Sequence, residues 1–184
     1  MCAPISDGAA ALVVCSDRWL NQRRGPVRER AVRVRACEWT GGRLRHPREP
    51  SLSFAAARRA YTTAGIEPRS ISVAEVHDAT SFSLIYQAEM MGFCESGDGG
   101  PFIASGATAL DGRIPLNPSG GLIGKGHPVG ATGIAMIHEL MLQLRGEAGS
   151  RQVRDANIGL AENGGGVIGF DEAVCIVTLL DRRP

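Results

Sequence analysis

Residues 117–133, "NPSGGLIGKGHPVGATG", guide the interpretation of this chain. They contain many glycines, two prolines, one histidine and the only lysine, Lys125. Two phosphate-binding motifs fit them poorly. A P-loop needs serine or threonine after Gly-Lys, but Gly126 follows Lys125, and the dinucleotide fingerprint needs glycine where Val129 stands. A helix predicted to begin near Val129 could still offer backbone N–H groups to an anion. The stretch is therefore predicted to present a side chain rather than to wrap a phosphate group.

The side chain in question is His127, which lies between Gly126 and Pro128. The proline restricts the backbone, and the glycine lets a ligand come close to it. A histidine held in this way suits a general base or a hydrogen-bond donor near neutral pH. The alternative is a histidine that only stabilises the loop.

Strand and helix patterns alternate on both sides of this stretch. They predict strands in 9–16, 31–39, 71–79, 155–166 and 172–180, and helices in 51–65, 81–93 and 131–144. Residues 97–111 are predicted to form a glycine-rich loop. Such an alternation is typical of a layered α/β fold.

Some of these elements carry predictions about burial. The strand in 9–16 is uniformly apolar and is expected to be buried on both faces. One apolar stripe is predicted for the helix in 131–144, made of Ala131, Ile134, Ala135, His138, Met141 and Leu142. His138 is therefore interpreted as a core or boundary histidine. Apolar runs also contain three cysteines that are expected to behave as small hydrophobic residues: Cys15, Cys37 and Cys175.

Length, composition and charge limit the class of protein. The chain has 184 residues, 43% of them hydrophobic, and a net charge of +1. This fits one domain, residues 1–184, and gives no support to nucleic-acid binding. No segment predicts a membrane span or a secretion signal, and the five cysteines lack the spacing of zinc sites or disulfides. We therefore expect a soluble, cytoplasmic protein without a bound metal, and, because residues 9–16 would open it in mid-core, sequence missing before Met1.

Two further candidate residues lie at the ends of predicted strands. His77 follows the strand in 71–79 and precedes Asp78, at the kind of strand end where ligand sites collect in α/β sheets. Alternatively, Asp78 caps the next helix and His77 packs beside it. Glu162 lies before a triple-glycine turn, where partial burial would raise its pKa and suit it to acid/base work. Alternatively, its carboxylate binds backbone amides in the turn.

Four segments together resemble the C-terminal half of the thiolases in order and spacing: "SDGAAALVV" (6–14), "EVHDATSF" (75–82), residues 117–133 and "ENGGGVIG" (162–169). They are most similar to the sterol-carrier-protein and lipid-transfer-protein branch. The resemblance implies a thiolase-like C-terminal domain, a layered α/β fold with a mixed, mostly parallel five-stranded sheet covered by helices. It also implies an acyl-CoA substrate, no bound cofactor, and assembly as a homo- or hetero-oligomer.

The resemblance assigns roles to the three candidates. His127 matches the histidine of the Gly-His-Pro motif, which activates the nucleophilic cysteine and helps to polarise the thioester carbonyl. His77 matches the oxyanion-hole position of the lipid-transfer branch, where a second imidazole can stabilise developing negative charge. Glu162 stands at the acid/base position, which a cysteine or, in that branch, a histidine occupies. The substrate-binding positions implied are Gly126, Asn163, Gly164 and Gly165.

Two departures from the family shape the functional prediction. A carboxylate at Glu162 makes retro-aldol cleavage of a β-hydroxyacyl-CoA an alternative to thiolase chemistry on a β-ketoacyl-CoA. The nucleophilic cysteine belongs to the N-terminal half of the family, which this chain lacks. We therefore predict the C-terminal domain of a thiolase-like acyltransferase of lipid or sterol side-chain metabolism, inactive without an N-terminal half or a partner subunit. A non-catalytic thiolase-like binding or scaffold subunit is the remaining alternative.

Overall fold

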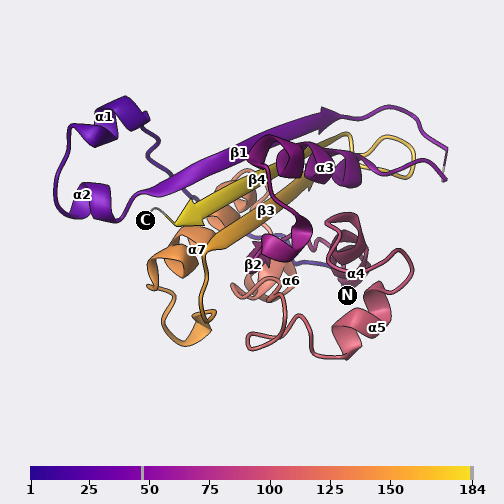
Figure 1. Cartoon of the computed structure of the whole chain (residues 1–184). Coiled ribbons are helices and arrows are strands. Elements are labelled where there is room, and N and C mark those ends of the chain that lie inside the picture. Colours follow the sequence, from indigo (N-terminus) through magenta and orange to yellow (C-terminus); the bar gives the residue numbers. More distant parts are fainter. Residues whose placement is uncertain (47, 183–184) are drawn as a thin grey trace.

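A computed structural model describes residues 1–46 and 48–182 and has one mixed β-sheet with helices on both faces (Figure 1). The strands are β1 (Val32–Gly41), β2 (Val73–Glu75), β3 (Ile158–Gly165) and β4 (Val174–Arg182). Their order in the sheet is β1-β4-β3-β2, with β1/β4 and β4/β3 antiparallel and β3/β2 parallel. The predicted layered α/β class is confirmed. The predicted five-stranded, mostly parallel sheet is wrong, because four strands form it and two of three pairings are antiparallel.

The missing fifth strand is the one predicted in 9–16. These residues have no regular secondary structure, and Val13 and Val14 are 97% and 81% exposed. An apolar run becomes a strand only where a neighbouring strand takes up its backbone hydrogen bonds. No strand in the described part of the chain pairs with it, so the run forms no strand and stays at the surface.

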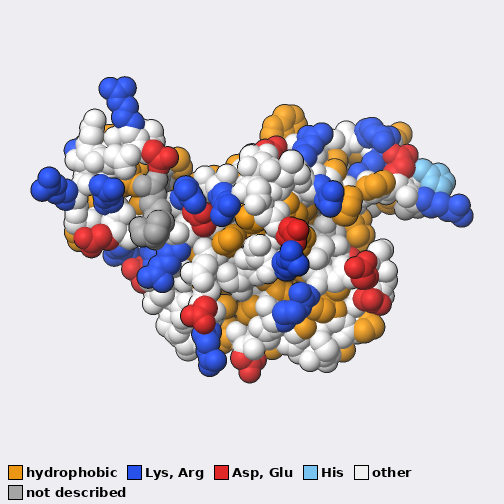
Figure 2. All heavy atoms as spheres, in the orientation of Figure 1, with side chains coloured by type: hydrophobic (Ala, Val, Ile, Leu, Met, Phe, Trp, Pro, Cys, Tyr) orange, Lys and Arg blue, Asp and Glu red, His pale blue; other side chains and the backbone are white. Residues whose placement is uncertain are grey.

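Two short helices follow this run and lie beyond one end of the sheet (Figure 1). They are α1 (Asp17–Asn21) and α2 (Pro26–Glu29). The Ser16 side chain accepts a hydrogen bond from Trp19 N and caps α1. Basic side chains gather over both helices (Figure 2). The helices lead into β1, which confirms the strand predicted in 31–39.

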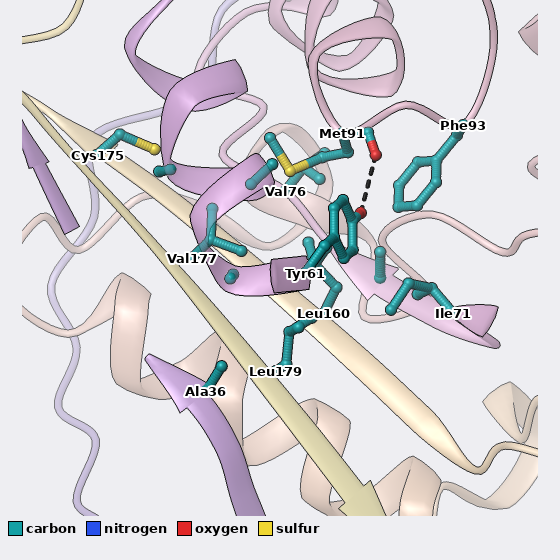
Figure 3. Close-up of a cluster of buried hydrophobic side chains, with 14 of the residues drawn as sticks. Ala36, Tyr61, Ile71, Val76, Met91, Phe93, Leu160, Cys175, Val177 and Leu179 are labelled. Atoms are coloured by element: carbon teal, nitrogen blue, oxygen red, sulfur yellow. Dashed lines mark hydrogen bonds between the residues drawn. The ribbon is translucent and has the colours of Figure 1, made fainter. Parts of the chain in front are cut away.

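One face of the sheet is covered by α3 (Leu52–Ala64), followed along the chain by α4 (Ser81–Met90) and α5 (Gly99–Ala104). The helix α3 begins at its cap Ser51 and ends at Gly65, which is left-handed with a φ of 64°, as its sequence predicts. Five of its seven buried residues are alanine or serine, so most of its length can pack close to the sheet. Figure 3 shows Tyr61 inside the resulting hydrophobic cluster, its hydroxyl donating to Met91 O at 2.8 Å.

The opposite face is covered by α7 (Thr132–Arg145). The predicted apolar stripe of this helix is wrong: His138 is exposed, and the buried apolar side chains are those of Met136, Leu140 and Leu144. The buried face also includes two polar residues that the pattern excluded. Gln143 Nε2 donates to Glu139 Oε1 at 3.0 Å, and the Glu139 carboxylate is paired with an arginine, so both can be buried.

Short connections complete the fold: 3₁₀ turns η1 (Pro68–Ser70) and η2 (Gly149–Arg151), and the helix α6 (Gly121–Lys125). The predicted loop in 97–111 contains α5. Cys175 is buried as predicted, whereas Cys15 and Cys37 are exposed, since one lies in the unpaired run and the other on the outer face of β1. Among residues 1–46 and 48–182, no helix has both the length and the apolar character needed to cross a bilayer.

Candidate active site

His77 and His127 come together in the folded chain, although they are fifty residues apart in the sequence. Their ring centroids are 5.0 Å apart, and the ring planes meet at 68°, edge to face. His77 follows β2, and His127 lies between α6 and α7. The pair therefore lies at the end of β2, where the strand-end argument placed His77.

Asn117 attaches the glycine-rich stretch to the end of β2. Its backbone N donates to Ala74 O at 2.8 Å. Its side chain accepts from Val76 N at 2.7 Å and donates to Val76 O at 3.1 Å, so it imitates a neighbouring strand. The residue adopts a left-handed backbone with a φ of 51°, which asparagine tolerates better than most residues. These bonds bring residues 117–133 alongside His77.

Lys125 neutralises a buried carboxylate. Glu75, at the end of β2, is 0% exposed, and its Oε2 lies 3.6 Å from Lys125 Nζ. Ser119 donates to the same carboxylate from its backbone N at 3.0 Å and from its hydroxyl at 2.6 Å. Burial raises the pKa of Glu75, and the ammonium group of Lys125 lowers it. The lysine thus joins α6 to β2, consistent with the poor fit to phosphate motifs.

Asp78 caps a different helix from the one expected. Its Oδ1 accepts from Leu122 N at 2.7 Å, at the start of α6. The next helix, α4, is capped by Thr80, whose hydroxyl accepts from Ser83 N at 3.1 Å. A Cβ on Gly121 would lie 2.2 Å from Asp78 Oδ2, so glycine at this position is required by the cap. Asp78 therefore holds α6, and with it the loop that carries His127.

The first residues of the chain connect the two histidine loops. Ser81 N donates to Met1 O at 3.0 Å, and Ala3 N donates to Ala79 O at 2.8 Å. On the other side, His127 N donates to Pro4 O at 3.0 Å. The Ser6 hydroxyl then packs against Gly126, where a Cβ would meet it at 2.5 Å. The segment that follows His77 and the loop that precedes α7 are thereby held at a fixed separation.

Thr132 fixes the tautomer of His127. The buried Thr132 hydroxyl lies 2.8 Å from His127 Nδ1 and donates to Pro128 O at 3.1 Å. A hydroxyl has one proton, so a threonine that donates to the carbonyl must accept from Nδ1–H. Neutral His127 then carries its free lone pair on Nε2. This arrangement supports the general-base alternative for His127, although the loop-stabilising alternative is compatible with the same contacts.

His77 is neutral at physiological pH. Burial, and secondarily the neighbouring His127, lower its pKa to about 4. Its Nε2 is buried and has no hydrogen-bond partner among the described residues. A neutral imidazole with an unused ring nitrogen can bind a substrate oxygen without carrying a charge into the site. This is the property that an oxyanion-hole position requires.

Glu162 reaches the backbone of His77 rather than either imidazole. Its side chain is 0% exposed, and Oε2 accepts from His77 N at 2.9 Å. Burial raises its pKa to about 7. Glu162 thus binds a backbone amide, as in the alternative interpretation, but the amide belongs to His77 and not to the glycine turn. Its acid/base role stays a prediction.

The predicted substrate-binding positions have different surroundings. Gly126 packs on Ser6, Asn163 lies on the α7 face with its Oδ1 close to Gly133, and Gly165 lies at the end of β3. Gly164 is buried beneath the carboxyl group of Glu172. Binding of substrate at these four positions stays a prediction.

The sequence patterns did not identify Thr132, Glu172 or the segment 1–6 as parts of this region. The signal for Thr132 was a hydroxyl one helical turn beyond Pro128, at the start of the helix. Glu172 carried no local signal, since the β3–β4 turn alone brings it back over Gly164. Residues 1–6 were missed because their contacts are backbone bonds, which depend little on side-chain identity.

Comparison with known proteins gives consistent results. Residues 50–178 match the family described as "Thiolase C-terminal domain-like". Acetyl-CoA acetyltransferase of Methanothermobacter thermautotrophicus is 43% identical over 173 residues, which cover 91% of this chain and 44% of that protein. Sterol carrier protein 2 of Homo sapiens is 40% identical over 189 residues, covering 94% of this chain and 34% of that protein. The chain thus spans less than half the length of these relatives.

A solved structure supports the fold. The structure named "Ltp2-ChsH2(DUF35) aldolase" superposes with a TM-score of 0.68 over 83% of this chain and 40% of that chain. Its sequence is 23% identical, so the likeness concerns the fold alone.

Proposed function

Because the chain belongs to the thiolase family, matching its C-terminal domain, we propose that it supplies the two-histidine part of an acyl-CoA acyltransferase site. The observation that supports this most directly is the edge-to-face contact of His77 and His127 at 5.0 Å. The substrate class is a β-ketoacyl-CoA, as in lipid or sterol side-chain metabolism. No cofactor is needed for this chemistry, and coenzyme A enters as the thioester substrate.

The two histidines are proposed to have different roles, a general base and a hydrogen-bond donor, because their ring nitrogens differ in protonation. His127 uses its Nε2 lone pair to take the proton of a nucleophilic cysteine, which an N-terminal half of the enzyme supplies. The imidazolium formed is stabilised because Nδ1–H already donates to Thr132. His77, neutral and with an unpartnered Nε2, donates to the thioester oxygen as negative charge develops there.

A second candidate reaction is retro-aldol cleavage of a β-hydroxyacyl-CoA. The observation in its favour is Glu162, a buried carboxyl with a raised pKa at the acid/base position. In this reaction a base takes the β-hydroxyl proton, the Cα–Cβ bond breaks to give a carbonyl product, and the thioester enolate is then protonated. A carboxyl that holds a proton near neutral pH suits the last step.

The partner is proposed to cover an apolar groove of about 430 Å³ beside α1, β1 and α7. Its lining includes Val13, Trp19, Val34, Ile137, Met141 and Leu180. Relatives that match this chain are more than twice its length, so a companion half of similar size fits a surface of this kind. We propose that an N-terminal half or partner subunit, or a further copy in an oligomer, occupies it.

The test is a reconstituted enzyme. This chain is co-expressed with a thiolase N-terminal half that contains the nucleophilic cysteine, and acyl-CoA cleavage is measured for wild type, His127→Ala and His46→Ala. His46 is exposed, so His46→Ala is the matched control. A loss of about 100-fold or more is expected for His127→Ala alone, as for removal of a general base.

Three outcomes separate the alternatives. Equal rates for wild type and His127→Ala would exclude the catalytic assignment. Cleavage of β-hydroxyacyl-CoA but not of β-ketoacyl-CoA would favour the retro-aldolase. Stable association and acyl-CoA binding without turnover would instead identify a non-catalytic binding subunit.

A further inference from the structure

Two carboxyl groups and one thiol lie together on the α3 and α4 side of the sheet, behind the histidine pair. Glu162 is on β3, Cys175 is on β4, and Glu172 is in the turn between these strands. The nearest oxygen of each carboxyl and Cys175 Sγ all lie within 4.8 Å of one another. Neither Glu172 nor Cys175 has a part in the chemistry proposed above.

The strand register explains how this cluster forms. Gly164 is paired with Cys175 across β3 and β4, and Glu162 lies two residues before Gly164, so all three face the same side. Because Gly164 has no side chain, the carboxyl of Glu172 fills the space over it; a Cβ there would lie 2.0 Å from Glu172 Oε1. The glycine therefore gives Glu172 access to Cys175.

Cys175 lies beside both carboxyls. Its Sγ donates to Glu162 Oε1 at 3.4 Å and lies within 4.8 Å of a Glu172 carboxyl oxygen. Glu172 Oε2 is buried and has no hydrogen-bond partner among the described residues. Burial, followed by the two carboxyl charges, raises the pKa of the Cys175 thiol strongly, so the sulfur keeps its proton. Having one proton, the thiol can donate to only one carboxyl while accepting from the other. Figure 3 shows its sulfur at one end of the hydrophobic cluster.

The groups around the cluster supply little positive charge, so one of the two carboxyls is expected to hold a proton. Burial and repulsion from Glu162 raise the pKa of Glu172 to about 8. Arg45, which lowers it slightly, is engaged in an ion pair with Asp171. From α4, Gln87 Nε2 donates to Glu172 Oε1 at 3.2 Å and brings no charge. From the end of β2, the His77 amide donates to Glu162 Oε2 at 2.9 Å and brings no charge.

We propose that Glu172 and Cys175 form a proton relay that connects the fully buried Glu162 to the partly exposed β3–β4 turn. In one transfer, the O–H bond of Glu172 breaks as an S–H bond forms on Cys175, and the original thiol proton moves to Glu162 Oε1. Cys175 is a thiol before and after, and the negative charge moves from Glu162 to Glu172. Use of this proton in catalysis rests on the function proposed above, whereas the relay itself does not.

The relay is tested on the isolated chain by infrared spectroscopy. After transfer into D2O near pH 6, the exchange of the protonated Glu162 carboxyl is followed through its carbonyl band, which is assigned by its absence in Glu162→Gln. Cys175→Ala is expected to slow this exchange about tenfold or more, since it removes the thiol that carries the proton between the carboxyls. Cys175→Ser, which keeps an O–H group, should exchange at nearly the wild-type rate. Cys37→Ala is the matched control at an exposed cysteine.

A second measurement tests the carboxyl pair itself. Glu162→Gln is expected to lower the titration midpoint of Glu172, because the charge that repels it is removed. Gly164→Ala should displace Glu172 and slow exchange at Glu162 as Cys175→Ala does. Glu95→Gln, at an exposed carboxyl, is the control for both.

Three results would overturn the relay: wild-type exchange in Cys175→Ala, an unchanged Glu172 midpoint in Glu162→Gln, or a stoichiometric metal ion in the purified chain, which would balance these charges instead. In the reconstituted enzyme, the catalytic use predicts a changed pH profile for Cys175→Ala that Cys175→Ser restores. If the isolated chain shows the relay but the reconstituted enzyme has no activity, the proposed function is refuted and the relay stands. If the enzyme is active but Cys175→Ala leaves its pH profile unchanged, only the catalytic use of the relay is refuted.

Discussion

At the scale of single residues, the arrangement of His127 depends on one hydroxyl group. Thr132 accepts from Nδ1 and is itself committed to Pro128 O, so it selects the tautomer whose Nε2 is a base. This is a positioning role, since nothing places Thr132 in contact with a substrate.

We expect Thr132→Val to let His127 populate both neutral tautomers, because the acceptor for Nδ1–H is gone. The ¹⁵N shifts of the His127 ring in the isolated chain would report this directly. In the reconstituted enzyme the rate should fall about tenfold, as part of the general-base contribution is lost. Thr132→Ser keeps the hydroxyl and is the control. Retention of a single Nδ1–H tautomer in the valine variant would contradict the assignment.

His77 should remain neutral well below the usual pH of histidine ionisation. Its pKa is lowered to about 4, mainly by burial. A histidine of the unfolded chain ionises near pH 6.5, so the stability that His77 contributes is complete above that pH and is lost as the pH falls toward 4. An NMR titration of the ring protons checks this, with exposed His46 in the same spectrum as the reference. A midpoint near 6.5 for His77 would refute its burial as a neutral group.

At the scale of elements, the loop that carries His127 is held by two links, one to β2 and one to the segment that follows it. Asp78 caps α6, and Lys125 pairs with Glu75, so the short helix is attached at both of its ends. A helix of five residues would be unstable alone, so α6 depends on these two links for its stability.

Lys125→Met is expected to lower the free energy of unfolding by about 2 kcal/mol, less than for a fully buried pair because the lysine is partly exposed. The cause is the Glu75 carboxylate, which stays buried without its cation. Urea unfolding at pH 7 measures the loss. The double variant Lys125→Met with Glu75→Gln removes the unpaired charge and should recover most of it. Equal losses in the single and double variants would show that the ion pair is not the cause.

Removal of residues 1–6 should loosen the His127 loop without unfolding the sheet. The segment gives its Pro4 carbonyl to His127 N and its Met1 carbonyl to Ser81 N. Hydrogen exchange should therefore accelerate in residues 126–132, while the inner turns of α7, at 136–144, keep their protection. Faster exchange throughout α7 would mean instead that the segment supports the whole layer.

At the scale of the whole molecule, buried acids make stability depend on pH in a particular direction. Glu162 and Glu172 ionise near pH 7 and 8 in the folded chain and near 4.3 when unfolded. Between these values the folded chain holds protons that the unfolded chain has released, so the free energy of unfolding falls as the pH rises.

Glu162→Gln should flatten this decline. The carboxyl is fully buried, and its pKa of about 7 against about 4.3 unfolded corresponds to a loss on the order of 3 kcal/mol between pH 4.5 and 8. Urea unfolding at several pH values, compared with Glu95→Gln, measures it. A wild-type slope in Glu162→Gln would show that this carboxyl does not hold its proton in the folded chain.

The apolar groove gives a prediction about association. Val13 lines it and is 97% exposed, so Val13→Glu should leave the fold intact and weaken binding of the proposed N-terminal half about tenfold. Leu44→Glu is the control, at a residue that is 76% exposed and lies outside the groove. Equal weakening by both variants would argue against the groove as the binding surface.

The sequence predicted the elements that form from local information. Capping by Ser51 and Gly65 located α3 closely, and alternation located β1. The run 9–16 was mispredicted because a strand needs a neighbour, which no local pattern reveals. The stripe of α7 was mispredicted because Glu139 and Gln143 satisfy one another and can be buried as polar groups. At the candidate site, the resemblance grouped His77 with His127, and their rings lie together in the structure. Thr132 and Glu172 were missed because their roles depend on three-dimensional neighbours.

The bond between Lys125 and Glu75 also makes the chain suitable for selective chemical labelling. Lys125 is the only lysine among the 184 residues, so this side chain is their one lysine target for an amine-directed fluorophore. The ε-amino group is engaged with Ser119 and Glu75, and its reaction rate therefore reports whether α6 is attached to β2. A dye at this position would lie two residues from His127 and could signal the arrival of a substrate without any introduced cysteine.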